Sequence, residues 1–244
     1  MASIGKTYTT TIQPYSKYGA TTVGRDKFYR AVQYGARALA YYAATYTNTS
    51  PETIKRLTAL KAAIGQARKL MRVGKPLDHL QSLVSSTQQP DDFLRLAGIL
   101  RYASLAAYLT FDMLQWIHSA GAYKFSNIKA YSRRASKFWL LGILFSWISG
   151  LYRLRALRIR GISLKRAQGD KAPESLSPVM RKEGEALVKE RREVETQLLQ
   201  DSLDALIPAS ALEYIRISDG LVGLAGFYTS LMGMRSQWRK VVVA

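Results

Sequence analysis

The sequence predicts an all-α, membrane-associated helical bundle with an N-terminal basic amphipathic helix and about two short transmembrane or membrane-embedded helices. Three observations lead to this prediction. Apolar residues recur at the three-to-four-residue spacing of a helix face, whereas alternating strand-like runs and hairpin turn dipeptides are essentially missing. Two segments of fifteen residues carry no charge. Cations outnumber acids, and many of them lie beside the apolar segments.

The charge balance indicates a polyanionic partner. The chain has 244 residues, with 36 Lys and Arg against 17 Asp and Glu, which gives a formal net charge of +19. Such a charge fits either nucleic acid or an anionic membrane. The aromatic residues lie inside apolar helical runs rather than between cations, and no RNA-recognition, KH or zinc-finger motif is present. We therefore expect an anionic phospholipid membrane as partner and no nucleic acid.

The composition leaves little room for catalysis or metal binding. The chain has no cysteine and two histidines, which excludes disulfides, thiolate metal sites and thiol nucleophiles. Residues 19–26 have the first glycine spacing of a phosphate-binding loop but lack the Lys and Ser/Thr that it needs. Asp91 and Asp92 are better explained as a helix cap, and His118 as a packing residue. We expect no enzyme activity, no catalytic residue, no metal and no cofactor.

The N-terminal third is amphipathic. We predict a helix over 26–46 and a second helix that begins at Pro51 and continues to Lys75. One face of the second helix is apolar and consists of Leu57, Leu60, Ile64, Ala67 and Met71. The cations that we expect to bind lipid lie mainly on the opposite arc and are Lys55, Lys61, Arg68, Lys69, Arg72 and Lys75. No acid lies between Thr53 and Pro76, which favours a helix in an anionic bilayer interface over a core helix with a solvated face.

Two uncharged segments are candidates for membrane insertion. Residues 138–152 would form a helix of about 22 Å, shorter than the hydrocarbon core of roughly 30 Å. Seven flanking cations and several aromatic residues nevertheless favour insertion over a buried core helix. Residues 220–234 place small residues on one helical stripe, which predicts a membrane helix with a packing face of Gly220, Gly223, Gly226 and Gly233. Residues 102–117 contain Asp112 and are expected to pack among other helices or to lie at the interface.

The remaining segments complete the organisation. Residues 161–184 are rich in Pro, Gly and Ser and are interpreted as a polar linker. Residues 185–207 contain no Gly or Pro and alternate charge sign at i,i+4, which predicts a solvent-exposed charged helix ended by Pro208. The predicted regions are an N-terminal amphipathic membrane-remodelling region (1–80), an apolar helical region (81–160), the linker (161–184), the charged helix (185–207), and a C-terminal glycine-rich helix with a basic tail (208–244).

Three stretches resemble one protein family. They are DKFYRAVQYGAR at 26–37, AIGQARKLMRVGK at 63–75 and ISDGLVGLAGFYTSLMGMRSQW at 217–238. In this order and spacing they resemble the peroxisomal membrane-elongation peroxins, the peroxin-eleven or peroxisome proliferation factor family, in the form found in filamentous fungi. The similarity covers nearly the whole chain. The middle stretch resembles the membrane-curving helix of the family through Arg68, Lys69, Arg72, Gly74 and Lys75.

The resemblance implies a protein of the peroxisomal membrane that promotes peroxisome elongation, proliferation and fission. Members of the family insert the amphipathic helix into one leaflet, self-associate as homo-oligomers, and help to recruit or stimulate the dynamin-related fission GTPase through its tail-anchored adaptor. A wedge about 5–10 Å deep expands one leaflet, so curvature would follow from the same geometry.

Two alternative functions remain open. One is a pore for small metabolites, lined by Asp112, His118 and Asp219; these residues could equally be polar groups between packed helices. The other is an adaptor for the fission machinery, which would use the charged helix 185–207.

Overall fold

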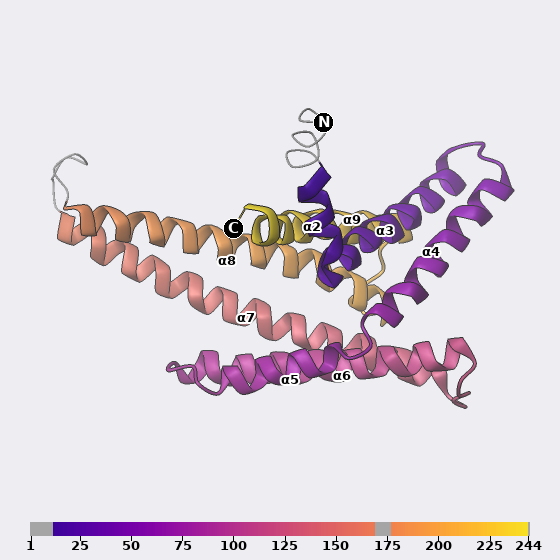
Figure 1. Cartoon of the computed structure of the whole chain (residues 1–244), viewed down its shortest axis with the longest axis horizontal. Helices are drawn as coiled ribbons and strands as arrows, with labels where there is room; N and C mark the ends of the chain where they lie inside the picture. Colours follow the sequence, from indigo (N-terminus) through magenta and orange to yellow (C-terminus); the bar gives the residue numbers. More distant parts are fainter. Residues whose placement is uncertain (1–11, 169–176, 244) are drawn as a thin grey trace, which may run out of the picture.

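The computed structural model describes residues 12–168 and 177–243, and every regular element within these ranges is helical. In chain order the elements are α2 (Gln13–Ala20), α3 (Thr22–Tyr46), α4 (Pro51–Met71), α5 (Lys75–Ser86), α6 (Asp92–Ala120), α7 (Ile128–Gln168), α8 (Pro178–Ala211), α9 (Asp219–Trp238) and the π-helical turn η3 (Arg239–Val243). The all-α prediction is confirmed. Neighbours in sequence pack as pairs, and α9 returns to lie along α3 (Figure 1).

The helices form an open, splayed bundle (Figure 1). The pair α7 and α8 extends to one side, the hairpin of α3 and α4 extends to the other, and α5 and α6 lie side by side below them. The buried core is correspondingly small. Tyr34 of α3, Ile207 of α8 and Val222 of α9 are buried together, and Trp139 and Ile217 pack against them. A bundle with so small a core leaves many apolar side chains exposed.

Side-chain caps fix several helix starts. Ser50 accepts a hydrogen bond from the backbone N–H of Thr53, and Pro51 occupies the first turn of α4, which confirms the predicted start of that helix. Asp91 accepts a hydrogen bond of 2.9 Å from the N–H of Leu94, which confirms its prediction as a helix cap. These local signals place α4 and α6 where the sequence analysis expected helices.

The predicted continuation of the amphipathic helix to Lys75 was wrong. α4 ends at Met71, and the chain turns at Gly74, whose φ of 90° lies in the left-handed region that glycine adopts without strain. Lys75 begins the separate helix α5, which also contains Leu77, Leu80 and Val84. The amphipathic segment is therefore two helices joined by a tight turn.

The predicted linker at 161–184 is mostly helical. α7 runs to Gln168 and α8 starts at Pro178, while residues 169–176 lie outside the described part of the chain. Gly161, a glycine taken as a linker signal, faces the partner helix at Leu187 instead, and Gly184, at the end of the predicted linker, lies opposite Leu164. Pro208 does not end the charged helix, since α8 continues to Ala211 with this proline fully buried.

Candidate membrane-contacting surface

The basic residues in the second half of α4 and at its C-terminal cap contact acids of other helices. Arg68 Nε lies 3.0 Å from Asp26 Oδ1 of α3, and both side chains are buried. Arg72 Nη2 lies 2.7 Å from Asp112 Oδ2 of α6. Towards the start of α4, Lys61 Nζ lies 3.9 Å from Asp219 Oδ2 of α9. Carboxylates from three different helices therefore hold this one helix.

Hydrogen bonds tighten the same contact. Arg68 also donates to Gln33 Oε1 at 2.7 Å, and Arg72 donates to the hydroxyl of Tyr108 at 2.9 Å. Lys69 donates to Gln115 Oε1 at 3.1 Å. We refer to Asp26, Asp112, Asp219, Lys61, Arg68, Lys69 and Arg72 as the α4 charge network.

The ionised state of the network follows from its geometry. Burial alone would raise the pKa of Asp26, but the nearby Arg68 and Arg72 guanidinium groups outweigh this and hold the pKa below its usual range. Asp26 is therefore a carboxylate at neutral pH. A buried charge without a partner is strongly unfavourable, so each of these pairs depends on both of its members.

The structure places the predicted lipid-binding cations differently from the sequence analysis. Arg68 is buried, Lys61, Lys69 and Arg72 are half-buried within the charge network, and Lys75 is half-buried at the start of α5. Lys55 is exposed. The absence of acids between Thr53 and Pro76 suggested a free basic face. The acids that pair with Lys61, Arg68, Lys69 and Arg72 come instead from α3, α6 and α9.

The outward side of α4 and α5 is apolar instead. Among the predicted apolar residues, Leu60 and Ala67 are exposed, whereas Leu57, Ile64 and Met71 are half-buried. Further exposed apolar residues, which the sequence analysis did not assign to lipid, extend over the turn and along α5. We call the exposed set the outer apolar stripes; it consists of Leu60, Ala67, Leu70, Val73, Leu77, Leu80 and Val84.

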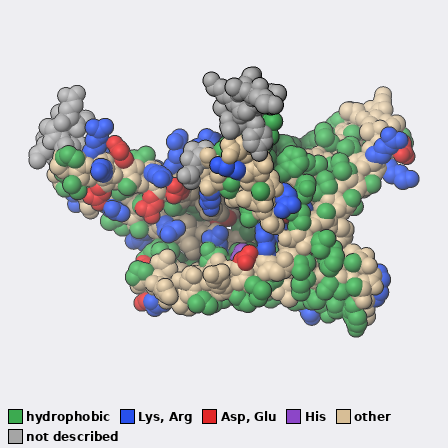
Figure 2. Space-filling model, viewed as in Figure 1, with side chains coloured by type: hydrophobic (Ala, Val, Ile, Leu, Met, Phe, Trp, Pro, Cys, Tyr) green, Lys and Arg blue, Asp and Glu red, His purple; other side chains and the backbone are tan. Residues whose placement is uncertain are grey.

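Exposure of these stripes is large. Leu77 and Val84 are 69% and 61% exposed. They share one helical stripe with Leu80, because the three residues follow one another at spacings of three and four. Figure 2 shows hydrophobic side chains spread over the arm of α3 and α4 and along α5 and α6. Extensive exposed apolar surface marks a membrane or protein contact. The helical periodicity of 77, 80 and 84 was visible in the sequence and could have identified the α5 stripe.

The predicted glycine face lies against α3. Gly220 faces Tyr41, Gly226 faces Tyr34 and Gly233 faces Lys27. A methyl group added at Gly223 would come within 2.6 Å of the backbone nitrogen of Ala38, so only glycine fits there. The four glycines thus let α9 approach α3 closely along its full length.

Comparison with known proteins identifies the family. The model of the family described as peroxisomal biogenesis factor 11 (PEX11) matches residues 12–238. The chain belongs to the PEX11 family.

Relatives of similar length support this assignment. Peroxisomal membrane protein PMP30B of Candida boidinii is 27% identical over 240 residues, covering 91% of this chain and 92% of that protein. Peroxisomal biogenesis factor 11 of Schizosaccharomyces pombe is 28% identical over 221 residues, covering 88% and 89%. Peroxisomal membrane protein 11A of Homo sapiens is 24% identical over 234 residues, covering 90% and 94%. No solved structure matches the chain.

PEX11 membership settles location and broad role. The chain is a protein of the peroxisomal membrane, and its family acts in peroxisome biogenesis. In the described ranges, α7 is the one helix that is long and apolar enough to cross a membrane, over Ile128–Ala167. Only 22% of its most apolar window is buried, and Leu144, Trp147 and Ile148 are among its exposed residues. The predicted insertion segment 138–152 lies within this helix.

The polar residues considered for a pore have partners in this PEX11 chain. Asp112 pairs with Arg72, and Asp219 accepts a hydrogen bond of 2.9 Å from Arg37 Nε. His118 Nδ1 accepts a hydrogen bond from the backbone N–H of Phe125 at 3.0 Å. These contacts join helices or close a turn.

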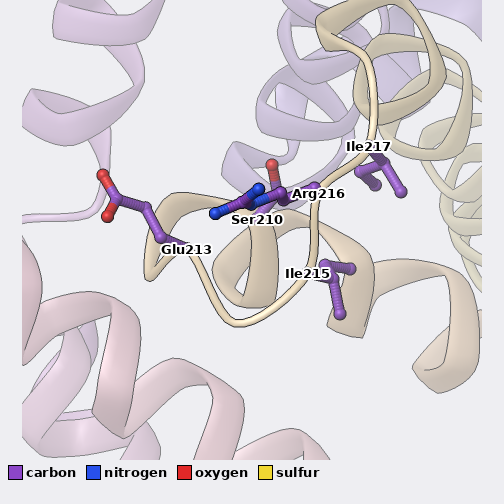
Figure 3. Close-up of a pocket in the computed structure, with 5 residues that line it drawn as sticks. All are labelled: Ser210, Glu213, Ile215, Arg216 and Ile217. Atoms are coloured by element: carbon purple, nitrogen blue, oxygen red, sulfur yellow. The ribbon is translucent and has the colours of Figure 1, made fainter.

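A polar pocket lies at the loop between α8 and α9. It is lined by Ser210, Glu213, Ile215, Arg216 and Ile217 (Figure 3). Glu213 has a positive φ of 61°, and its carboxylate points away from the Arg216 guanidinium in Figure 3. The pocket contains no histidine and no second carboxylate, and no metal-binding cluster occurs among residues 12–168 and 177–243. Its residues show no arrangement of nucleophile and base.

Proposed function

We propose that this chain elongates the peroxisomal membrane before division by inserting the outer apolar stripes of α4 and α5 into one leaflet. The observation that carries the proposal is the orientation of α4: Lys61, Arg68 and Arg72 pair with carboxylates of other helices, whereas Leu60, Ala67 and Leu70 are exposed. Such an amphipathic helix lies with its apolar face about 5–10 Å into the leaflet. The inserted volume expands one leaflet and bends the membrane.

The charge of the chain supplies the attraction to the membrane. With 36 Lys and Arg against 17 Asp and Glu, a large positive excess remains after the α4 charge network is neutralised. Each cation close to an anionic leaflet contributes about 1 kcal/mol. Elongation in this proposal is mechanical work done by binding energy, with no covalent step and no enzyme activity.

The partners follow from the same proposal. Copies of the chain would self-associate on the curved membrane, and the dynamin-related GTPase with its tail-anchored adaptor would complete fission. The exposed arm of α8 offers a surface for such partners, since Val179 and Val188 are 74% and 66% exposed among charged neighbours. A metabolite pore is the weaker alternative, because Asp112, His118 and Asp219 are engaged in contacts between or within helices.

The test uses the purified full chain with anionic and neutral vesicles, examined by electron microscopy. We expect tubes on anionic vesicles with the wild type and none with Leu70→Glu or Leu77→Glu. Ser85→Glu is the matched control, because it adds the same charge at an exposed polar position of α5, on the side of the helix that already carries Asp78, and should leave tubes intact. Unchanged tubulation by both leucine variants would overturn the proposal. Ion conductance across a planar bilayer would support the pore instead.

A further inference from the structure

An apolar groove runs between α3, α4 and α9. Its floor consists of small residues on α3, namely Ala31, Gly35 and Ala36. Its walls are large apolar side chains, among them Phe28 of α3, Leu57 of α4 and Phe227 of α9. Leu60 also lines the groove and is the residue that the groove shares with the outer apolar stripes. Every residue that lines it is apolar or glycine, so the groove offers no side-chain hydrogen bond to a polar ligand.

The size of the groove suits a single hydrocarbon chain. Its volume is about 360 Å³. A methylene group takes up roughly the 30 Å³ of a water molecule in the liquid, which gives room for about a dozen carbons. A single extended hydrocarbon chain fits, and the protein lies in a membrane that supplies such chains.

One end of the groove is positively charged. α3 and α9 run antiparallel, since Gly220 faces Tyr41 while Gly233 faces Lys27. Arg25 precedes Phe28 by one helical turn, and Arg235 follows Leu231 by one helical turn. Both arginines therefore extend the lining stripes at the same end of the groove.

These two arginines are available to an anion. Both side chains are exposed, and neither forms an ion pair with any of the described residues. An apolar slot with two available guanidinium groups at one end matches an amphiphile with an anionic head.

We propose that this groove binds one acyl chain of an anionic membrane phospholipid, with the phosphate of the lipid at Arg25 and Arg235. The lipid would be a bound ligand held at a defined site, in contrast to the bulk leaflet that the outer apolar stripes of α4 and α5 enter. The inference rests on the membrane location of the chain and stands whether or not the chain bends membranes.

The experiment is photo-crosslinking of the reconstituted full chain with an anionic phospholipid that carries a diazirine in one acyl chain. Peptide mapping by mass spectrometry should place the label on both α3 and α9. Gly35→Leu fills the floor of the groove, because a Cβ there meets only the Phe227 ring at 3.4 Å, and it should reduce that label several-fold. Gly19→Leu is the matched control, since no atom lies within 4 Å of its Cβ, and it should label like the wild type.

A second variant tests the head group without filling the groove. Arg25→Gln combined with Arg235→Gln changes only exposed side chains, so we expect an unchanged circular dichroism spectrum and equal labelling by anionic and zwitterionic probes. The wild type should prefer the anionic probe several-fold.

Two outcomes would overturn the inference. One is labelling that Gly35→Leu leaves unchanged in a folded protein. The other is labelling by a diazirine fatty acid but not by the phospholipid.

Discussion

α4 and α9 both pack on α3, but they are held by different physical means. α9 is held by shape: four glycines bring its backbone against Tyr34, Ala38 and Tyr41. α4 is joined to α3, α6 and α9 by the ion pairs of the α4 charge network, while Leu60 and Leu70 remain exposed. A contact made by shape depends on side-chain volume, whereas a contact made by ion pairs depends on the charge of each member. Contact by shape suits two helices that stay packed together. Contact by ion pairs can orient a helix while its apolar side stays exposed.

The largest expected effect comes from adding volume to the joint of α9. Gly223→Leu would drive a side chain into the backbone of Ala38, which cannot move aside as a flexible side chain could. We expect loss of the folded protein, and even Gly223→Ala should destabilise by about 1–3 kcal/mol. Urea unfolding in mild detergent, followed by circular dichroism, measures this.

Gly19→Ala serves as the control, because the space around Gly19 is open. A Gly223→Ala protein as stable as this control would show that α9 is not held by close approach to α3.

An effect smaller than the loss of folding in Gly223→Leu is expected from breaking one buried pair of the charge network. Asp26→Asn leaves the buried Arg68 guanidinium without its carboxylate, which should cost about 3–5 kcal/mol at most. The double variant Asp26→Leu, Arg68→Met removes both charges and should recover most of this loss, because apolar pairs of similar volume replace buried ion pairs well. The same unfolding measurement on Asp26→Leu, Arg68→Met and the double variant closes the cycle and gives the coupling free energy of the pair.

A coupling free energy near zero between Asp26 and Arg68 would contradict this comparison of α4 with α9. α4 would then be held by packing, as α9 is, and its outward leucines would need another explanation. The exposed pair Arg191 and Glu195 on α8 provides a reference, since exposed i,i+4 pairs contribute only about 0.3–0.5 kcal/mol.

The two helices also differ in how much of them the sequence could predict. The glycine face of α9 is a local pattern, because small residues at spacings of three and four lie on one side of any helix. The position of the α4 cations is not local: Asp26, Asp112 and Asp219 lie far away in sequence and meet α4 only in the folded chain. Periodicity therefore predicted an amphipathic helix with an apolar face, but not that its cations pair with acids of other helices.

The helix boundaries show the same limit of prediction from a single sequence. Gly161 and Gly184 resemble linker residues in sequence, yet they lie inside helices because each faces a leucine of the partner helix. Pro208 commonly ends a helix, but α8 continues past it to Ala211. Such exceptions depend on tertiary packing, which a single sequence does not display.

The smallest expected effect is the pH dependence of the stability that the Asp26 ion pair contributes. The pKa of Asp26 is lower in the folded chain than in the unfolded one, where an aspartate titrates near about 3.9. The stabilisation from its ion pair is therefore fully present above pH of about 4 and is lost as pH falls through the folded value. Unfolding free energies of the wild type and of Asp26→Asn should consequently differ by a constant amount from pH 7 to pH 5 and converge only in stronger acid. A difference that already shrinks between pH 7 and pH 5 would mean that Asp26 binds a proton near neutrality, and charge would then not hold α4 in place.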